Sequence, residues 1–386
     1  MREKVVEWFH SCNKKELFYW INFILFFMSN IHSFGENLVR VCILAMYVFG
    51  LLYMVYKNPE FKRPPMYLIV IFVVYLILNT IIMRTVSVHI IYCVVSFIVI
   101  RELKFSKNEL LSIINRTAIV YIILSVLISY TPLSVLSIYD TRLVVNRFFP
   151  HILYRFVGVE GTPAGPDIFF IIVIFSNIFF NKTNNRYFYI ILSILLLIWT
   201  SSLSPLLSIV GALLILPFTK SKAIKTIYSY LIWLYEFIII AIYSYGTVGI
   251  RNILNLASTL RARIWYNMYY SLIGHDSLAQ WNLGRVGLVN FEHSPGYDIN
   301  NPHNYSLFLL QFGGILAFII IVVLATMYFR NMNIKYKIFI VSVLLIYAST
   351  NTFILSIRGN PIFIFVLVTY LASGNEPENE TTGNYK

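Results

Sequence analysis

Apolar segments of about 20 residues recur from Leu17 almost to the C-terminus of this 386-residue chain. Such a length is what an α-helix needs to cross a hydrocarbon layer about 30 Å thick. Only 12% of the residues are charged and 58% are hydrophobic, whereas soluble domains are about 25% charged. So few charges cannot cover a water-soluble surface. The sequence therefore predicts an all-α, polytopic integral membrane protein.

The apolar windows predict about twelve transmembrane helices. They fall at about 17–34, 38–56, 66–83, 85–100, 117–137, 166–181, 187–202, 205–219, 226–246, 303–329, 336–356 and 360–373. Both helices of the 187–219 pair are short, so a re-entrant hairpin fits this segment as well as two spans do. We expect one membrane domain over residues 1–373, followed by a short cytoplasmic tail at 374–386.

The basic residues orient the spans. Alternation from a cytoplasmic N-terminus places all fourteen lysines and both termini in the cytoplasm, in agreement with the positive-inside rule. The outer side receives ten arginines and no lysine: Arg40, Arg84, Arg142, Arg147, Arg155, Arg251, Arg261, Arg263, Arg285 and Arg358. The net charge of +13 is scattered over short connections and forms no single stripe, which argues against nucleic acid as a partner.

Arginine and lysine orient a membrane protein about equally well. Orientation therefore does not explain why the predicted outer side has arginine but no lysine. Guanidinium presents a planar fork of donors that matches phosphate oxygens, and it stays charged. Two interpretations are open: the outer arginines bind a phosphate-bearing ligand, or they anchor helices at the membrane interface. We favour the ligand for Arg261 and Arg263 and the anchor for Arg40 and Arg84.

The three cysteines, Cys12, Cys42 and Cys93, form no CxxC pair, and no histidine stands at a metal-ligand spacing from them. We therefore expect neither a metal site nor a disulfide framework, and no cofactor.

Two outer (periplasmic) loops, about 138–165 and 247–302, are long enough to hold a site, since long structured loops are usually functional. In the second loop, apolar and aromatic residues recur at helical spacing over 259–273. This pattern predicts an amphipathic helix on the membrane surface that holds Arg261 and Arg263 at the level of lipid phosphates. A purely anchoring helix would have the same pattern.

His303 and Asn304 directly follow the second loop, at the start of the predicted span 303–329. Asn301 can cap that helix and Pro302 suits its first turn. A helix N-terminus disfavours the charged form of a histidine, and a neutral imidazole can act as a general base on a hydroxyl. A solvated interfacial histidine is the alternative interpretation.

The segment from Pro302 to Asn304, followed by Leu307, Leu310, Gly313 and Gly314, resembles the His-Asn-then-distal-Gly signature of the O-antigen ligase and polymerase superfamily. Segments 161–165, 201–205 and 261–265 occur upstream in the family's order, and 358–361 lies between a final pair of spans. The resemblance covers about residues 155–371.

The resemblance implies an inverting, metal-independent glycosyltransferase in the bacterial inner membrane, whose active site faces the periplasm. Its substrates would be undecaprenyl-diphosphate-linked oligosaccharides. It implies His303 as the catalytic base, Arg263 and then Arg261 on the diphosphate, and Asn304 as a positioning residue. Membrane lipids and a chain-length regulator protein are further expected partners.

Two departures from the family pattern guide the choice of activity. Many ligases have an arginine where this chain has 202–204, so either Arg155 or Arg358 would have to replace it, or the donor is held differently. Only Ala317 stands where a small residue is expected after the glycines. We therefore expect an O-antigen polymerase, with a ligase that transfers polymer to lipid A core as the alternative. A flippase or transporter is disfavoured, because Glu236 is the clearest mid-span carboxylate.

Overall fold

The structure is a computed structural model. It describes residues 14–29, 36–57, 70–71, 73–75, 77–78, 80–81, 88–103, 105–131, 156, 158, 164–201, 203–215, 237–257, 261–275, 282, 291–294, 297–299, 305–330, 333, 336–337, 366 and 369. All structural statements below concern these residues.

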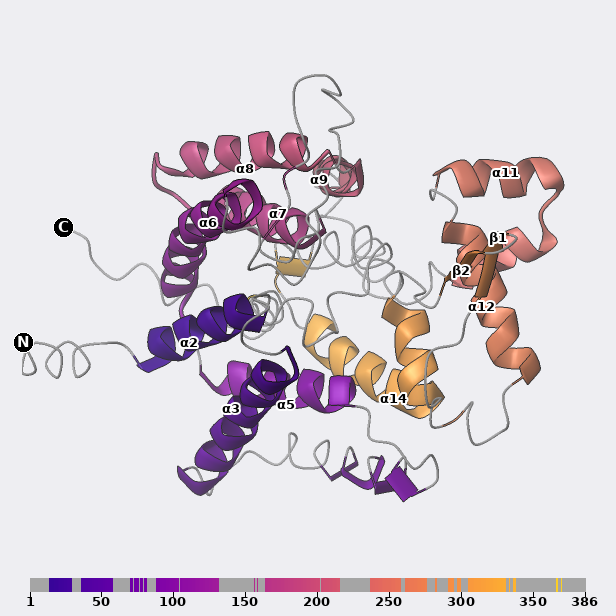
Figure 1. Ribbon diagram of the computed structural model, residues 1–386, viewed down its shortest axis with the longest axis horizontal. Helices are drawn as coiled ribbons and strands as arrows, with labels where there is room; N and C mark the ends of the chain where they lie inside the picture. Colours follow the sequence, from indigo (N-terminus) through magenta and orange to yellow (C-terminus); the bar gives the residue numbers. More distant parts are fainter. Residues whose placement is uncertain are drawn as a thin grey trace, which may run out of the picture. The chain divides into compact units, whose positions relative to one another are not determined.

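Helices make up almost all of the described structure (Figure 1). They are α2 (Lys14–Ser29), α3 (Glu36–Lys57), α5 (Val88–Glu102), α6 (Lys107–Tyr130), α7 (Ala164–Phe179), α8 (Arg186–Thr200), α9 (Leu203–Ile215), α11 (Val248–Ala257), α12 (Arg261–His275) and α14 (Tyr305–Arg330). Residues 237–245 are also helical. One antiparallel hairpin joins β1 (Phe291–Ser294) to β2 (Tyr297–Ile299). The predicted all-α class is confirmed, with this hairpin as a small local departure.

The described helices follow most of the apolar windows, and α6 differs most from its window. It begins at Lys107, ten residues before the predicted start at 117, because Ser106 and Glu109 form a reciprocal capping box. It ends at Tyr130, shortly before Pro132, which disfavours helix in the residue before it. The windows at 336–356 and 360–373 lie almost entirely outside the described residues.

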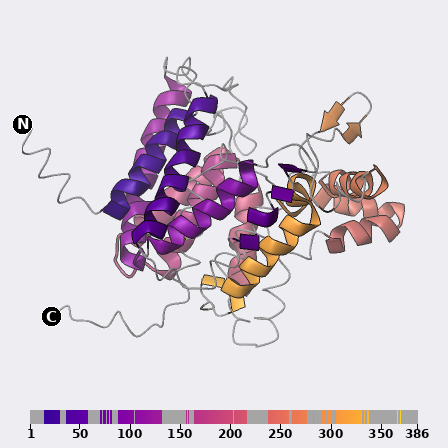
Figure 2. The same cartoon turned by 90° about the horizontal axis from the view of Figure 1, so that it is seen from below.

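The chain forms two compact units, which are treated separately. The first unit comprises residues 1–54, 95–203 and 356–373. Its α7 packs against both α6 and α8 (Figures 1 and 2). The second unit comprises residues 55–94, 204–355 and 374–386, and in it α12 contacts α11, β1 and α14.

Buried polar pairs connect successive helices of the first unit. Asn22 of α2 donates to the Tyr47 hydroxyl of α3. The side chains of Asn115 in α6 and Asn177 in α7 exchange two hydrogen bonds, of 3.2 and 2.8 Å. Thr200 of α8 donates to the carboxylate of Asp167 in α7. Because helices packed among apolar side chains gain specificity from such polar contacts, these pairs set the register of the unit.

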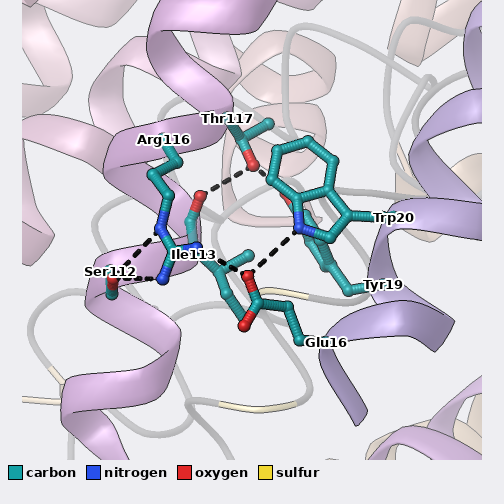
Figure 3. Close-up of polar contacts among 7 residues, drawn as sticks. All are labelled: Glu16, Tyr19, Trp20, Ser112, Ile113, Arg116 and Thr117. Atoms are coloured by element: carbon teal, nitrogen blue, oxygen red, sulfur yellow. Dashed lines mark hydrogen bonds and ion pairs between the residues drawn. The ribbon is translucent and has the colours of Figure 1, made fainter. Parts of the chain in front are cut away.

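The contact between α2 and α6 combines a buried and an exposed pair (Figure 3). The hydroxyls of Tyr19 and Thr117 lie 2.9 Å apart in the buried part. At the exposed part, Arg116 donates to Glu16 at 2.8 Å, and the same Glu16 oxygen accepts from the indole of Trp20 at 3.3 Å. Since an exposed ion pair contributes little, about 0–1 kcal/mol, the buried pair is the stronger determinant of this contact.

The first unit buries several polar side chains beside its apolar core and exposes large apolar side chains on its surface. In α8, Ser193 and Thr200 are buried, whereas Ile191 and Leu195 are more than half exposed. The same pattern recurs in α2 and α6. Their exposed apolar residues include Ile24 and Ile123, and their buried polar residues include Asn22, Ser29, Asn115, Thr117 and Ser125. A water-soluble helix has the opposite distribution. Contiguous exposed apolar faces of this kind mark surfaces that meet something other than water.

One helix of the described residues is long and apolar enough to cross a membrane, the segment Lys107–Ile128 within α6. Shorter apolar helical segments are Leu38–Met54, Pro166–Phe179 and Arg186–Thr200. The 187–219 window contains two short helices, α8 and α9, with Ser201 in the left-handed region between them. The number of spans stays a prediction.

Helix α14 is interrupted at Gly314, which has φ 64° and ψ −174°. The carbonyl of the preceding Gly313 accepts a hydrogen bond of 2.8 Å from the hydroxyl of Tyr75. One turn before the interruption, the fully buried amide of Gln311 has no hydrogen-bond partner. An unpaired buried amide costs about 1–3 kcal/mol, so α14 is locally weak here.

We expect Gly314→Ala to lower the midpoint of thermal unfolding, because a backbone near φ 64° and ψ −174° is adopted almost only by glycine. The cost is about 1–3 kcal/mol. Gly249→Ala is the matched control, since its new methyl group would meet nothing closer than Thr247 Oγ1 at 4.0 Å within α11. That variant should keep or raise the midpoint. Equal midpoints for the two variants would contradict the left-handed conformation at Gly314.

Candidate functional site

The predicted amphipathic helix of the second outer loop exists as α12, shifted by two residues from 259–273 to Arg261–His275. Ala262, Ile264, Trp265 and Met268 are buried, and Arg263 is exposed. The spacing explains this division, since residues 265 and 268 lie on one side of the helix and residue 263 on the other. The helix therefore has one face that anchors it and one that is accessible.

The anchoring face of α12 packs against α14 and the helix at 237–245. Trp265 and Met268 form a hydrophobic cluster with Ile240 and with Leu307 and Leu310 of α14. Leu307 lies only four residues after His303 in the sequence, and α14 begins two residues after His303. Trp265 lies two residues after Arg263. The cluster thus ties the arginine-bearing helix to the first turns of the helix that follows His303.

Arg263 differs from the other arginines whose side chains the structure describes. Arg101 lies 3.9 Å from Glu102, Arg116 pairs with Glu16, and Arg186 donates to Tyr187. Arg40 also has an interaction partner. Within this described set, only Arg263 has no hydrogen bond, ion pair, ring contact or other electrostatic interaction, and it is exposed. Its guanidinium is therefore available to an anion.

Arg251, one of the ten arginines predicted to lie on the outer side, has a structural role instead. Its Nε donates to the carbonyl of Tyr243 and its NH2 group to the carbonyl of Ser244, both at 2.8 Å. A cation at these carbonyls is stabilised by the C-terminal end of the helix at 237–245. Arg251 therefore fits neither of the two interpretations given for these arginines, which were a ligand contact and an interfacial anchor.

Aromatic side chains line the accessible side of α12. Tyr266 and Tyr270 have ring centroids 4.6 Å apart, and Tyr266 lies 5.1 Å from Tyr243. Asn255 donates to the Tyr243 hydroxyl at 3.2 Å, and the Arg251 guanidinium lies 5.6 Å from the Tyr243 ring. Three elements thus hold these rings in place.

Several predicted site residues fall where the structure gives no description. His303, Asn304, Arg155 and Arg358 lie outside the described residues. Arg261 is the first residue of α12, and its side chain is not among those described. Of the predicted site, the structure describes the side chain of Arg263 and the packing of its helix, α12, against the first turns of α14.

Two features of the outer loops were missed by sequence reasoning. The first is the hairpin of β1 and β2, in which Glu292 pairs with Asp298 in register and β1 contacts α12. Its signal was the Pro295-Gly296 dipeptide between two short segments, which is typical of a hairpin turn. The strands show that the loop is locally ordered there.

The second missed feature lies where α7 begins and α8 ends. Asp167 in the first turn of α7 is buried and accepts a hydrogen bond from Thr200, as described above. Next to Thr200, Ser201 is fully buried and in the left-handed region, and its hydroxyl has no hydrogen-bond partner. The backbone N–H of Phe156 donates to the Trp199 carbonyl at 3.1 Å. This bond ties Phe156, which follows Arg155 in the sequence, to the end of α8.

The accessible face of α12 has the chemistry of an anion site. An exposed guanidinium without a partner can form a bidentate pair with phosphate oxygens. Among the described residues, no group of three or more His, Cys, Asp or Glu side chains is placed to hold a metal ion. Among the described residues, Arg263 is thus the group that could neutralise the charge of a bound anion.

We expect Trp265→Ala to destabilise the protein strongly, because it leaves a large cavity between α12 and α14. Truncation of a buried tryptophan costs about 3–5 kcal/mol. Arg263→Ala is the control on the same helix, and it should leave the midpoint of thermal unfolding unchanged because its side chain is exposed and unpaired. A loss of stability in Arg263→Ala would mean that the arginine is structural.

Comparison of the chain with protein-family models, with curated proteins and with solved structures finds no match.

Proposed function

We propose that this protein is an O-antigen polymerase, a membrane-embedded glycosyltransferase that joins repeat units carried on undecaprenyl diphosphate. The observation that carries the proposal is the position of Arg263, exposed and unpaired on a helix whose opposite face is packed against the first turns of α14. The chain enters α14 directly after His303 and Asn304. The helix that bears Arg263 is thereby packed against the helix that His303 precedes in the sequence.

The chemistry proceeds by inverting displacement at the anomeric carbon of the donor sugar. The acceptor hydroxyl attacks this carbon while its proton passes to the imidazole of His303. The bond between the anomeric carbon and the diphosphate oxygen breaks, and undecaprenyl diphosphate leaves. Arg263, supported by Arg261, neutralises the charge that develops on the diphosphate, so no acid is needed. Asn304 orients the acceptor sugar or the imidazole.

The membrane environment is part of the proposal, with about twelve spans, a periplasmic site and both termini in the cytoplasm. The distribution of side chains in the first unit supports it, because exposed Ile191 and Leu195 suit lipid and buried Asn115 and Asn177 avoid it. The segment Lys107–Ile128 has the length and hydropathy of a span. The arginines of the outer loops would then lie near the headgroups that carry the substrate diphosphate.

A ligase that transfers finished polymer to lipid A core is the second candidate, because it would use the same donor and the same base. The absence of arginine in 202–204 favours the polymerase. Arg155 would be one replacement, and its sequence neighbour Phe156 donates its backbone N–H to the Trp199 carbonyl of α8. Arg358 would be the other replacement.

We expect His303→Ala to abolish glycan chain extension in cells, since the acceptor hydroxyl loses its base. Arg263→Lys should also be strongly impaired, because a point charge does not replace a bidentate fork. Arg186→Lys is the matched control, because residue 186 lies in a predicted cytoplasmic connection. It should keep the wild-type distribution of polymer lengths. The measurement is the distribution of polymer lengths on lipopolysaccharide gels, at equal protein levels. A normal polymer length in His303→Ala would refute its role as base.

The same gel, run on a strain that lacks the protein, distinguishes a polymerase from a ligase. A single repeat unit attached to lipid A core is the result expected for loss of a polymerase. Complete absence of O-antigen from core would instead identify a ligase.

We expect cysteine labelling to place the second outer loop in the periplasm. In a background with Cys12, Cys42 and Cys93 replaced by serine, Val248→Cys should react with a membrane-impermeant maleimide in intact cells, because residue 248 is exposed. Asn184→Cys, exposed in the turn before α8, should react only after permeabilisation. Labelling of the two cysteines in the reverse order would overturn the orientation.

A further inference from the structure

The accessible face of α12 continues beyond Arg263. Tyr266, Asn267 and Tyr270 follow it at three, four and seven residues, and these spacings put all four residues on one side of a helix. At a rise of about 1.5 Å per residue, the face extends about 10 Å from Arg263 to Tyr270. Tyr270, at its end, is 45% exposed.

The two rings on this face are held in fixed positions. The centroid of Tyr270 lies 4.6 Å from that of Tyr266, and its hydroxyl lies 3.4 Å from the Ser244 hydroxyl. Tyr266 in turn packs against Tyr243, which Asn255 and Arg251 hold in place. A surface of rigid aromatic rings binds a ligand at a lower entropic cost than flexible side chains do.

We propose that this face binds the glycan of the lipid-linked substrate, with the diphosphate at Arg263 and the following sugars along Tyr266 and Tyr270. The inference rests on the proposed function and names the part of the substrate that the site recognises. The apolar C–H face of a sugar ring packs on an aromatic ring, and the sugar hydroxyls bond to phenol and amide groups such as Asn267. An arginine followed by rings on one helix face matches a phosphate followed by sugars.

An aromatic belt at a membrane interface is the competing explanation for exposed tyrosine, and the two make different predictions. A tyrosine that contacts lipid contributes equally to the binding of undecaprenyl diphosphate with and without a glycan. A tyrosine that contacts sugar contributes only when the glycan is present. Binding of the same lipid with and without its sugars therefore separates them.

The experiment measures binding to the purified full-length protein through the shift of its thermal unfolding midpoint. The two probes are undecaprenyl diphosphate alone and the undecaprenyl-diphosphate-linked repeat unit extracted from the cells that make this protein. We expect wild type to respond to the bare lipid and to bind the glycan-bearing lipid more tightly. Tyr270→Ala should keep the first response and bind the glycan-bearing lipid about tenfold more weakly than wild type. Tyr270→Phe should keep both responses, because the ring remains.

Tyr187→Ala is the matched control, since Tyr187 is an exposed tyrosine of α8 in the other unit. It should behave as wild type with both probes. A wild-type preference for the glycan that survives in Tyr270→Ala, or that is lost equally in Tyr187→Ala, would overturn the inference while leaving the proposed function intact. No response of wild type to either lipid would instead overturn the proposed function itself.

Discussion

Pairing of buried polar groups is the constraint on which the first unit depends. Its helices carry apolar side chains on their outer faces, so hydrophobic contact alone does not specify which faces meet. The pairs of Asn115 with Asn177 and of Tyr19 with Thr117 do specify them, because an amide or hydroxyl left unpaired among apolar side chains is costly. The register of α2, α6 and α7 follows from these contacts.

The second unit depends on a different contact, the packing of Trp265 and Met268 of α12 against α14. This contact converts a surface helix into a fixed element and leaves Arg263 exposed on its other side. Arg251 uses its charge to hold the carbonyls of Tyr243 and Ser244 and so supports the scaffold. Two arginines of the same loop thus serve different purposes, one structural and one available to a ligand.

Much of the helical arrangement could be predicted from the sequence, because apolar runs and turn residues are local signals. The windows at 38–56 and 187–202 match α3 and α8 to within two residues, and 259–273 matches α12 equally well. The early start of α6 at its capping box and the hairpin at 291–299 were missed, although Ser106 and Pro295 carried the signals. The residues of the candidate site were chosen from charge type and from a family resemblance, and of them the structure describes the side chain of Arg263.

The sequence by itself determined that this chain is helical and apolar, that the loops predicted to lie outside contain arginine without lysine, and that His303 directly precedes an apolar segment. Tertiary structure alone decided that Arg251 is paired and Arg263 is not, because partners such as the Tyr243 carbonyl come from other elements. It also decided that α12 packs against α14 and that Gly314 interrupts α14. The reason is physical: helix formation depends on neighbours along the chain, whereas the availability of a charged group depends on what other segments bring to it.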